Sequence, residues 1–244
     1  MAQKSKIEWT ENTWNPVTGC TKTSDGCVNC YAFPLAERLR CMGNSKYDKG
    51  FEVTLHPQSL NDPLTWKKPS IIFVNSMSDI FHEQIPDEFI IEIFNVMNKA
   101  HHHIFQLLTK RELRMMKIAD KLTWGSNIMM GVTVENAKYL RRIEALRETP
   151  AITRFISFEP LLAGIENPNL RDIHWAIVGG ESGNAARPMK EEWVLSIKDA
   201  CEHSGTLFYF KQWGGRNKKK AGRELLGKTW DAVPNIMELN KLIA

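Results

Sequence analysis

The chain has 244 residues, of which 43% are hydrophobic and 25% are charged, and its net charge is +4 at pH 7. These values are ordinary for one folded, water-soluble domain of this length. No stretch approaches the 18 or so consecutive apolar residues of a membrane span, which excludes a helical membrane protein. The polar stretch from Met1 to Glu11 has no secretory pattern, so we expect a cytoplasmic protein without a membrane partner.

The first chemical feature in chain order is a group of three cysteines within eleven residues, Cys20, Cys27 and Cys30. In a reducing compartment, clustered thiols more often bind metal than form disulfides. We expect the two remaining cysteines, Cys41 and Cys201, to be structural. The motif is thus a candidate metal centre.

The number of clustered cysteines separates two kinds of metal centre. A structural zinc ion normally takes four protein ligands, whereas a 4Fe-4S cluster held by three cysteines leaves one iron open to another ligand. The sequence therefore favours a cluster. His56 or His82 could complete a zinc site, so zinc remains an alternative, as do a disulfide and inert thiols.

After the cysteines, the sequence repeats a short β-branched or aromatic run, a polar stretch and an amphipathic helical stretch. The runs predict strands at Ile71–Asn75, His103–Leu108, Ile128–Val134, Thr153–Phe158, His174–Val178 and Leu207–Phe210. Apolar residues at helical spacing predict helices at Tyr31–Arg40, Asp87–Ala100, Ala137–Glu148 and Lys190–His203. Alternating strands and helices imply parallel strands with covering helices. We predict a partial (β/α)6-type barrel over residues 1–215, with 216–244 as a basic tail of the same domain.

Polar or ionisable residues follow each predicted strand. In parallel α/β folds the carboxyl ends of the strands share one face, where ligands bind. One such residue alone is explained by a strand leaving the core, but the repetition predicts a functional face.

Together, the cysteine loop, the aromatic residue after Cys30 and the strand–helix repeats resemble the radical S-adenosylmethionine superfamily. More narrowly, the chain is similar to a phage-associated three-cysteine-motif family of poorly characterised proteins. The segments that carry this resemblance are Trp14–Ala32, Ser76–His82, Thr109-Lys110-Arg111, Gly131–Asn136, Ser157–Leu162, Val178–Arg187 and Phe210–Gly214.

The chain departs from the superfamily in two places. Six residues separate Cys20 from Cys27, where the superfamily usually has three. The superfamily's Gly-Gly-Glu element follows the second strand, whereas Gly179-Gly180-Glu181 comes much later, so its role is not transferred.

The resemblance implies a 4Fe-4S cluster on Cys20, Cys27 and Cys30 that cleaves S-adenosylmethionine to a 5′-deoxyadenosyl radical. Such an enzyme needs an electron donor such as flavodoxin or ferredoxin. Lys110 is the candidate for the methionine carboxylate, because related radical enzymes carry a Thr-Lys pair at a corresponding strand end. The other cofactor candidates are Ser76, Ser78 and Asp79 for the amino group, and Thr133 and Glu135 for the ribose. Turn caps and loop salt bridges explain any one of them equally well.

The later strand ends are expected to face the substrate. The candidates are Glu159, Glu181, Arg187, Lys211, Gln212 and Trp213. Lysine and arginine would hold phosphate and Trp213 could stack on a base, which makes a nucleotide, DNA or RNA substrate plausible, although a core role is the more frequent one for tryptophan.

Two other functions stay open: a zinc-binding protein that binds or processes nucleic acid, and a cluster-bearing partner subunit without turnover. Basic residues gather near the end of the chain, at Arg216, Lys218, Lys219, Lys220 and Arg223, either as a nucleic-acid contact or as a solvated loop. Leu225, Leu226, Trp230 and Ile236–Leu242 are candidates for a terminal lid or helix.

Overall fold

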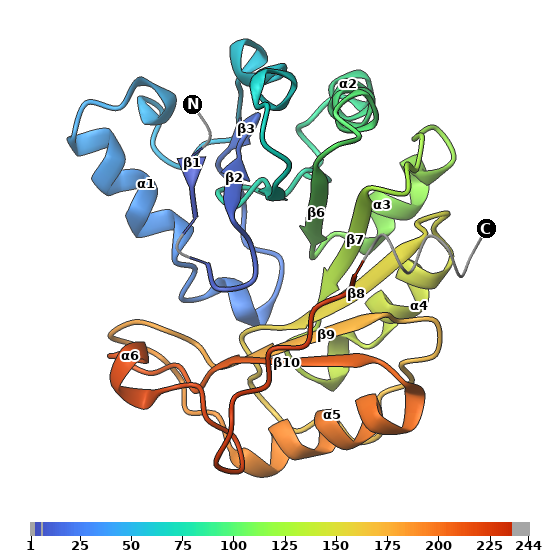
Figure 1. Cartoon of the computed structure of the whole chain (residues 1–244). Coiled ribbons are helices and arrows are strands. Elements are labelled where there is room, and N and C mark those ends of the chain that lie inside the picture. The colour runs from blue at the N-terminus through green and yellow to red at the C-terminus, as the bar shows by residue number, and fades with distance from the viewer. Residues whose placement is uncertain (1–2, 6, 236–244) are drawn as a thin grey trace. The chain divides into compact units, whose positions relative to one another are not determined.

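The computed structural model describes residues 3–5 and 7–235. Eight of the described strands form one sheet, in which seven run parallel and β1 lies antiparallel at the edge (Figure 1). In sheet order they are β1 Gln3–Lys4, β2 Asn12–Trp14, β5 Ile71–Val74, β6 Ile104–Thr109, β7 Ile128–Thr133, β8 Thr153–Phe158, β9 Trp175–Gly179 and β10 Leu207–Gln212. The helices are α1 Ala32–Cys41, α2 Asp87–Lys99, α3 Glu112–Ala119, α4 Arg141–Arg147, α5 Glu191–Ser204 and α6 Lys218–Ala221. This is the partial α/β barrel class that the sequence predicts.

The chain forms two compact units, which are described separately below. The first unit holds residues 1–23, 30–130 and 149–152, and the second holds 24–29, 131–148 and 153–244. Strand β7 begins in the first unit and ends in the second. Residues 216–235, set apart in the sequence by their basic charge, belong to the second unit.

In the first unit, β2, β5 and β6 lie side by side and parallel. Their register pairs Trp14 with Val74 and Val74 with Leu107, so the polar segments that follow these strands leave from one edge. A small two-stranded antiparallel sheet pairs β3 (Val17–Thr18), which precedes the cysteine motif, with β4 (Thr54–Leu55), which follows α1.

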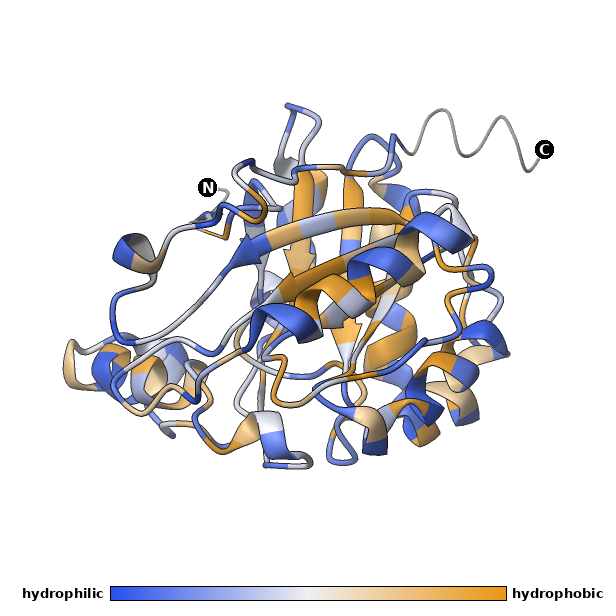
Figure 2. Cartoon of the chain, turned by 90° about the horizontal axis from the view of Figure 1, so that it is seen from below, coloured by the Kyte–Doolittle hydropathy of each residue, from blue (hydrophilic) through white to orange (hydrophobic). Residues whose placement is uncertain are grey.

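In the second unit, β8, β9 and β10 are parallel neighbours, and Phe158, Val178 and Phe210 stand at matching positions. All five residues of β9 are buried, as expected for a strand covered on both faces. Figure 2 shows the strands as largely hydrophobic. Gly131 in β7 is required by packing, because a Cβ atom there would lie 2.5 Å from the ring of Phe155.

All six predicted strands are present, with ends that differ by one or two residues. The predicted helix at Ala137–Glu148 starts later, at Arg141, after a short 3-10 turn at Ala137–Tyr139. The short strands β1 to β4 and the helices α3 and α6 were not predicted, because two to four residues, or a single pair of turns, give little periodicity. The segment Ile236–Leu242 lies outside the described residues. Within the described chain, no helix is long and apolar enough to cross a membrane.

Candidate active site

Cys20 is presented by a tight turn of the first unit. Gly19 has a φ of +83°, and a Cβ atom there would lie 2.1 Å from the carbonyl oxygen of Glu52, so only glycine fits. The Gly19 amide donates to Met77 O at 3.0 Å, and the Cys20 amide donates to Phe51 O at 3.3 Å. The backbone that leads into Cys20 is therefore held by two hydrogen bonds.

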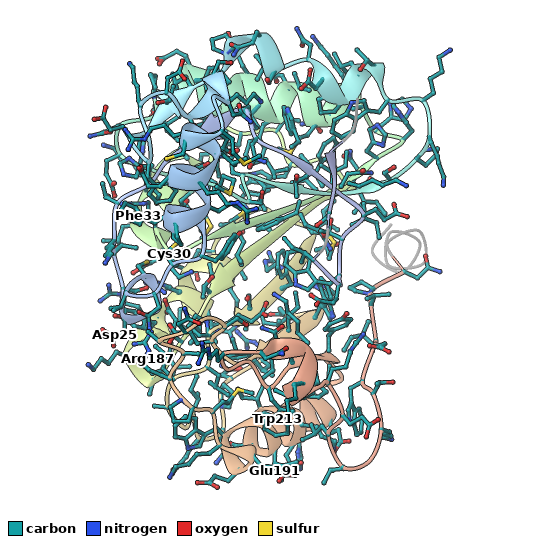
Figure 3. The ribbon with its side chains drawn as sticks, turned by 90° about the vertical axis from the view of Figure 1, so that its left-hand side faces the viewer. Asp25, Cys30, Phe33, Arg187, Glu191 and Trp213 are labelled. Carbon is teal, nitrogen blue, oxygen red and sulfur yellow. The ribbon has the colours of Figure 1, made fainter. Side chains whose placement is uncertain are left out.

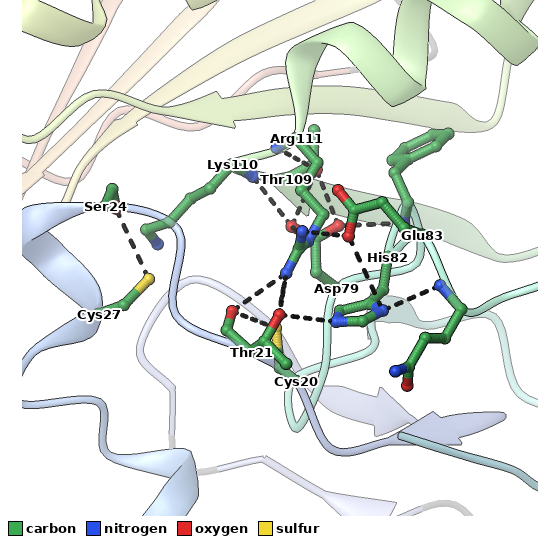
Figure 4. Close-up of polar contacts among 12 residues, drawn as sticks. Cys20, Thr21, Ser24, Cys27, Asp79, His82, Glu83, Thr109, Lys110 and Arg111 are labelled. Carbon is green, nitrogen blue, oxygen red and sulfur yellow. Dashed lines mark hydrogen bonds and ion pairs between the residues drawn. The ribbon is translucent and has the colours of Figure 1, made fainter. Parts of the chain in front are cut away.

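Arg111, which follows the end of β6, contacts this turn through its side chain (Figure 4). Its Nη2 donates to Thr21 O at 3.0 Å and to Thr21 Oγ1 at 2.9 Å, and it lies 3.9 Å from Cys20 Sγ. Its Nη1 pairs with the carboxylate of Glu83. Burial opposes the charge of Arg111, but the bonds to Glu83 and Cys20 outweigh burial and raise the pKa of the guanidinium. No role was predicted for Arg111, although it directly follows Lys110.

His82 supports the same turn. Its Nδ1 accepts from the Gln84 amide at 3.1 Å, and its Nε2 lies 2.9 Å from Thr21 Oγ1. The ring is thus used through both nitrogens. Burial and the nearby Arg111 charge lower the pKa of His82, which favours the neutral form.

Asp79 joins the ends of β5 and β6. Its carboxylate accepts from Thr109 Oγ1 at 2.8 and 2.9 Å, from the Lys110 amide at 3.0 Å and from the Phe81 amide at 3.0 Å. The oxygens of Asp79 are therefore occupied by its own fold, and its observed role is to position Thr109 and Lys110.

The other predicted cofactor residues of the first unit retain binding capacity. Ser76 Oγ donates to Asn15 Oδ1 at 3.2 Å, and Ser78 Oγ donates to Val17 O at 2.9 Å, so each hydroxyl oxygen can still accept a bond. Lys110 is partly buried, and its ammonium makes no hydrogen bond or ion pair in the described part of the chain. It is a cation placed at a strand end and open to an anion.

Cys30 lies beside the start of α1 in the first unit (Figure 3). It packs against a small apolar cluster that includes Ala32, Ala36 and Met77. The neighbouring Tyr31 hydroxyl donates to Ser76 O at 2.5 Å, which ties the helix start to the end of β5.

Cys27 sits in the segment Ser24–Asn29, which belongs to the second unit. The turn is closed by the Cys27 amide, which donates to Ser24 O at 2.9 Å, and Cys27 Sγ lies 3.6 Å from Ser24 Oγ. Ser24 Oγ in turn donates to the carboxylate of Glu135. A Cβ atom on Gly26 would lie 2.6 Å from Glu135 Oε1, so the turn sits directly on this carboxylate.

Two further contacts hold the same segment. The Asp25 amide donates to the Tyr139 hydroxyl at 3.1 Å, and Arg187 Nη2 donates to Asp25 O at 3.0 Å. Figure 3 shows Asp25 and Arg187 close together. Asn29 Nδ2 donates to Glu181 Oε2 at 2.9 Å, so both ends of the segment are anchored.

Glu135 and Arg142 form a buried ion pair beneath this segment. Glu135 is 0% exposed and Arg142 is 1% exposed, and Arg142 Nη1 lies 2.8 Å from Glu135 Oε2. Since Glu135 also accepts from Ser24, its observed role is to anchor the cysteine segment. Thr133, the other residue predicted for the ribose, is buried and its Oγ1 has no partner among the described residues.

Glu181 and Arg187 form the second ion pair of this unit. Arg187 donates to Glu181 through its side chain, with Nη2 2.5 Å from Oε1, and through its amide at 2.9 Å. Burial alone would raise the pKa of Glu181, but Arg187 and Asn29 outweigh it and lower that pKa. Glu181 is therefore a carboxylate fixed in its charged form.

Glu159 and Lys211 form the third pair, with Lys211 Nζ 2.9 Å from Glu159 Oε1. Ser157 Oγ donates to Glu159 Oε2 at 3.1 Å. Gln212 Nε2 donates to Ser182 Oγ at 2.6 Å, while its buried Oε1 has no partner in the described chain. The strand ends thus carry alternating acids and bases, largely compensated within the unit.

Trp213 is used by the fold in a way the sequence did not reveal. Its indole N–H donates to Glu224 O at 2.9 Å, and its ring meets Phe210 edge-on with centroids 4.9 Å apart. Its carbonyl approaches Gly180 so closely that a Cβ atom there would lie 2.0 Å away. The indole is therefore one support of the loop that follows β10.

Three thiols are the donor set of the candidate metal centre. The three motif cysteines are partly exposed and not disulfide-bonded, whereas Cys201 is buried and burial raises its pKa to about 12. Among the described residues of each unit, no three His, Cys, Asp or Glu side chains come together as a metal site. The motif cysteines are divided between the units, with Cys27 in the second and the other two in the first. Cys41, the fifth cysteine, is exposed.

The two histidines considered as zinc ligands are both engaged elsewhere. His56 Nε2 is hydrogen-bonded to Thr18 Oγ1 at 2.8 Å, and burial, helped by the charge of Lys46, lowers its pKa to about 4. His82 has both ring nitrogens engaged, as described above, whereas His56 is held through Nε2.

Comparison with known proteins gives a family and distant structural similarity. No curated protein matches the chain. Spore photoproduct lyase complexed with dinucleoside spore photoproduct is similar with a TM-score of 0.49 and 11% identity, over 84% of this chain and 64% of the other. A double mutant of that lyase with bound AdoMet and the dinucleoside gives 0.47 and 10% over the same shares, and a single mutant gives 0.48 and 12% over 74% and 58%. The chain thus spans less than two thirds of these proteins.

The family match is much more extensive, because the model of one family matches residues 4–234. That stretch includes the three cysteines, every strand end described above and the loop after β10. The chain therefore belongs to the family described as "protein of unknown function (DUF5131)".

Proposed function

We propose that this protein is a radical S-adenosylmethionine enzyme, with a 4Fe-4S cluster on Cys20, Cys27 and Cys30, that modifies a nucleotide or nucleic acid. The observation that carries the proposal is the set of three thiols, each in a segment fixed by its own unit, while His82 has both ring nitrogens engaged and His56 one. Three sulfur ligands leave one coordination position of a cluster open. Such a cluster, when bound, supplies the electron that cleaves S-adenosylmethionine to methionine and a 5′-deoxyadenosyl radical.

The residues of the first unit would bind the methionine part of the cofactor. Lys110 offers its unpaired ammonium to the carboxylate, and the hydroxyl oxygens of Ser76 and Ser78 can accept from the amino group. Asp79 keeps Lys110 in place through the Lys110 amide. These roles follow from charge and hydrogen-bonding capacity.

The residues of the second unit would hold the ribose and the substrate. Thr133 Oγ1 is a buried hydroxyl with unused capacity, and Glu135 fixes the Cys27 segment. Lys211 and Arg187 are cations suited to phosphate, each now balanced by an acid of the same unit. Phosphate binding would exchange or share these carboxylate contacts.

Anaerobic purification tests the cluster directly. We expect a brown protein with about four irons per chain, and loss of iron in Cys27→Ala. Cys41→Ala is the matched control, because Cys41 is an exposed cysteine outside the motif, and it should keep its iron. A colourless protein with stoichiometric zinc would contradict the proposal.

Cleavage of S-adenosylmethionine by the reduced protein tests the activity. We expect 5′-deoxyadenosine from the wild type with a flavodoxin or ferredoxin as electron donor, and a raised KM for S-adenosylmethionine in Lys110→Met. An iron-loaded, reduced protein that forms no 5′-deoxyadenosine would exclude the enzyme and leave a partner subunit without turnover.

A further inference from the structure

The loop that follows β10 holds a concentration of positive charge that the candidate site does not use. Residues 214–223, here called the basic loop, contain Arg216, Lys218, Lys219, Lys220 and Arg223 and no acidic residue. The net charge of the whole chain is +4, so the five cations of the loop leave a net charge of −1 for the rest. The positive charge of this protein is thus a local property.

The basic loop is an ordered structure of the second unit. The Gly215 amide donates to Glu181 O at 2.7 Å, and the Gly183 amide donates to Gly215 O at 3.2 Å. Trp213, just before the loop, contacts its far end: the Trp213 amide donates to Gly222 O at 3.2 Å, and the Trp213 indole N–H donates to Glu224 O. The loop is closed on itself, with the short helix α6 at its tip.

The cations of the loop whose side chains the structure describes are of two kinds. Arg223 pairs with Asp231 and lies over the ring of Tyr209 at 5.3 Å. Arg216 and Lys220 are exposed, and neither has an acidic partner among the described residues. Crowding like charges in a closed loop opposes folding, because they repel one another there more than in an extended chain. An external polyanion would remove this repulsion.

We propose that the basic loop is a docking site for the phosphate backbone of a polynucleotide. It starts three residues after Lys211, next to the strand ends where the proposed reaction occurs, so a polynucleotide strand bound to it would extend from the substrate position. A repeating phosphodiester matches a run of lysines and arginines, of which Arg216 and Lys220 are exposed, without requiring base contacts. An anionic membrane fits less well, because the only apolar side chain within the loop is Ala221.

The assignment of the polynucleotide as substrate rests on the proposed function, whereas binding itself does not. Fluorescence anisotropy of the full-length protein with labelled 20-nucleotide DNA and RNA, single- and double-stranded, at 50 to 300 mM salt measures it. The test variant combines Lys218→Gln, Lys219→Gln and Lys220→Gln. The matched control combines Lys49→Gln, Lys67→Gln and Lys68→Gln, three exposed lysines of the first unit.

We expect the test variant to bind at least tenfold more weakly at 50 mM salt than the wild type. Its slope of log K against log salt should be smaller by about 2, since each lost contact with a single strand contributes about 0.7. The control triple should bind within about twofold of the wild type. Thermal unfolding of the test variant separates a binding role of the lysines from a structural role. A purely structural role would lower the Tm of the test variant, whereas relief of charge repulsion would leave its Tm equal or higher.

Three results would overturn the proposal: no oligonucleotide binding by the wild type at 50 mM salt, equal losses in the two triple variants, or binding to phosphatidylserine vesicles but not to oligonucleotides. Iron content and 5′-deoxyadenosine formation by the wild type are measured separately. Loop-dependent binding by a protein without iron would refute the proposed function and keep the docking site. The reverse result would refute only the docking site.

Discussion

The two sides of the cysteine motif are held by opposite chemistry. Around Cys20, the contacts come from a glycine turn and from Arg111, a cation that reaches the thiol and the carbonyl beside it. Around Cys27, carboxylates accept from both ends of the segment, Glu135 from Ser24 and Glu181 from Asn29, and Arg187 adds one bond to Asp25 O. The comparison teaches that the motif is no independent loop, because each unit supplies its own support to its own cysteines.

The largest effect is expected where the Cys27 side depends on a buried charge. Glu135→Ala leaves Arg142 buried without its carboxylate, which should lower the free energy of unfolding by about 3–5 kcal/mol. Urea denaturation measures this, and hydrogen exchange should show faster opening of residues 24–29. The control is Glu144→Ala, because Glu144 is an exposed carboxylate on the same helix and its pair with Arg147 should contribute less than about 1 kcal/mol. Similar losses in both variants would contradict the buried anchor.

The next largest effect is expected at the glycine turn on the Cys20 side. Gly19→Ala adds a clash with the backbone of Glu52 to the strain of a positive φ, and should cost about 2–4 kcal/mol. Gly43→Ala has a similar φ of +73° but open space around its Cβ, so it isolates the strain and should cost about 1 kcal/mol. Urea denaturation and iron content together test the turn, and an iron-loaded Gly19→Ala of wild-type stability would argue against it.

The charge of Arg111 on the Cys20 side is expected to affect the midpoint potential of the proposed cluster. If the proposed cluster is present, a cation 3.9 Å from Cys20 Sγ favours the reduced, more negative state. Arg111→Gln should therefore lower the midpoint potential, by about 59 mV for each 1.4 kcal/mol of stabilisation lost, and Arg111→Lys should lower it less. Redox titration followed by electron paramagnetic resonance gives the potentials. Unchanged potential in Arg111→Gln would leave this residue a structural role only.

The smallest effect is expected from His56, which lies near the Cys20 side. Because burial lowers its folded pKa to about 4, the unfolded chain binds one more proton between pH 6.5 and 4. The stability from neutral His56 is thus fully present above pH 6.5 and is lost on acidification, at up to about 1.4 kcal/mol per pH unit. His56→Gln should flatten the pH dependence of unfolding in that range, while His101→Gln, at an exposed position, should not. Equal slopes would refute this.

The sequence predicts the parts of the fold that are set locally. The six strands and the long helices α2 and α5 are predicted by hydrophobic periodicity. Once the strands are predicted, so are the polar residues that follow them. The partners of the strand-end residues do not follow, because they depend on pairings between distant segments. Asp79 and Glu135 are the clearest cases, since each carboxylate is already satisfied by the fold.

The same distinction, between local patterns and contacts of distant segments, applies to the remaining site residues. Lys110 and Thr133 retain capacity for a ligand, which no local pattern could reveal. Arg111 was overlooked because an arginine next to a lysine reads as ordinary surface charge, and the turn it supports is 90 residues away in the chain. The cofactor contacts stay predictions until a ligand is bound.

The anchoring of the Cys27 segment also sets an order for biosynthesis. Ser24 meets Glu135 across 111 residues of sequence, and Asn29 meets Glu181 across 152. At roughly 5–20 residues per second, the second of these partners is synthesised about 8–30 s after Asn29. A nascent chain therefore carries the motif thiols for many seconds before the native contacts of this segment can form. If the proposed cluster is present, its loading is expected to follow synthesis of Glu181, and products truncated before Glu181 should not retain iron.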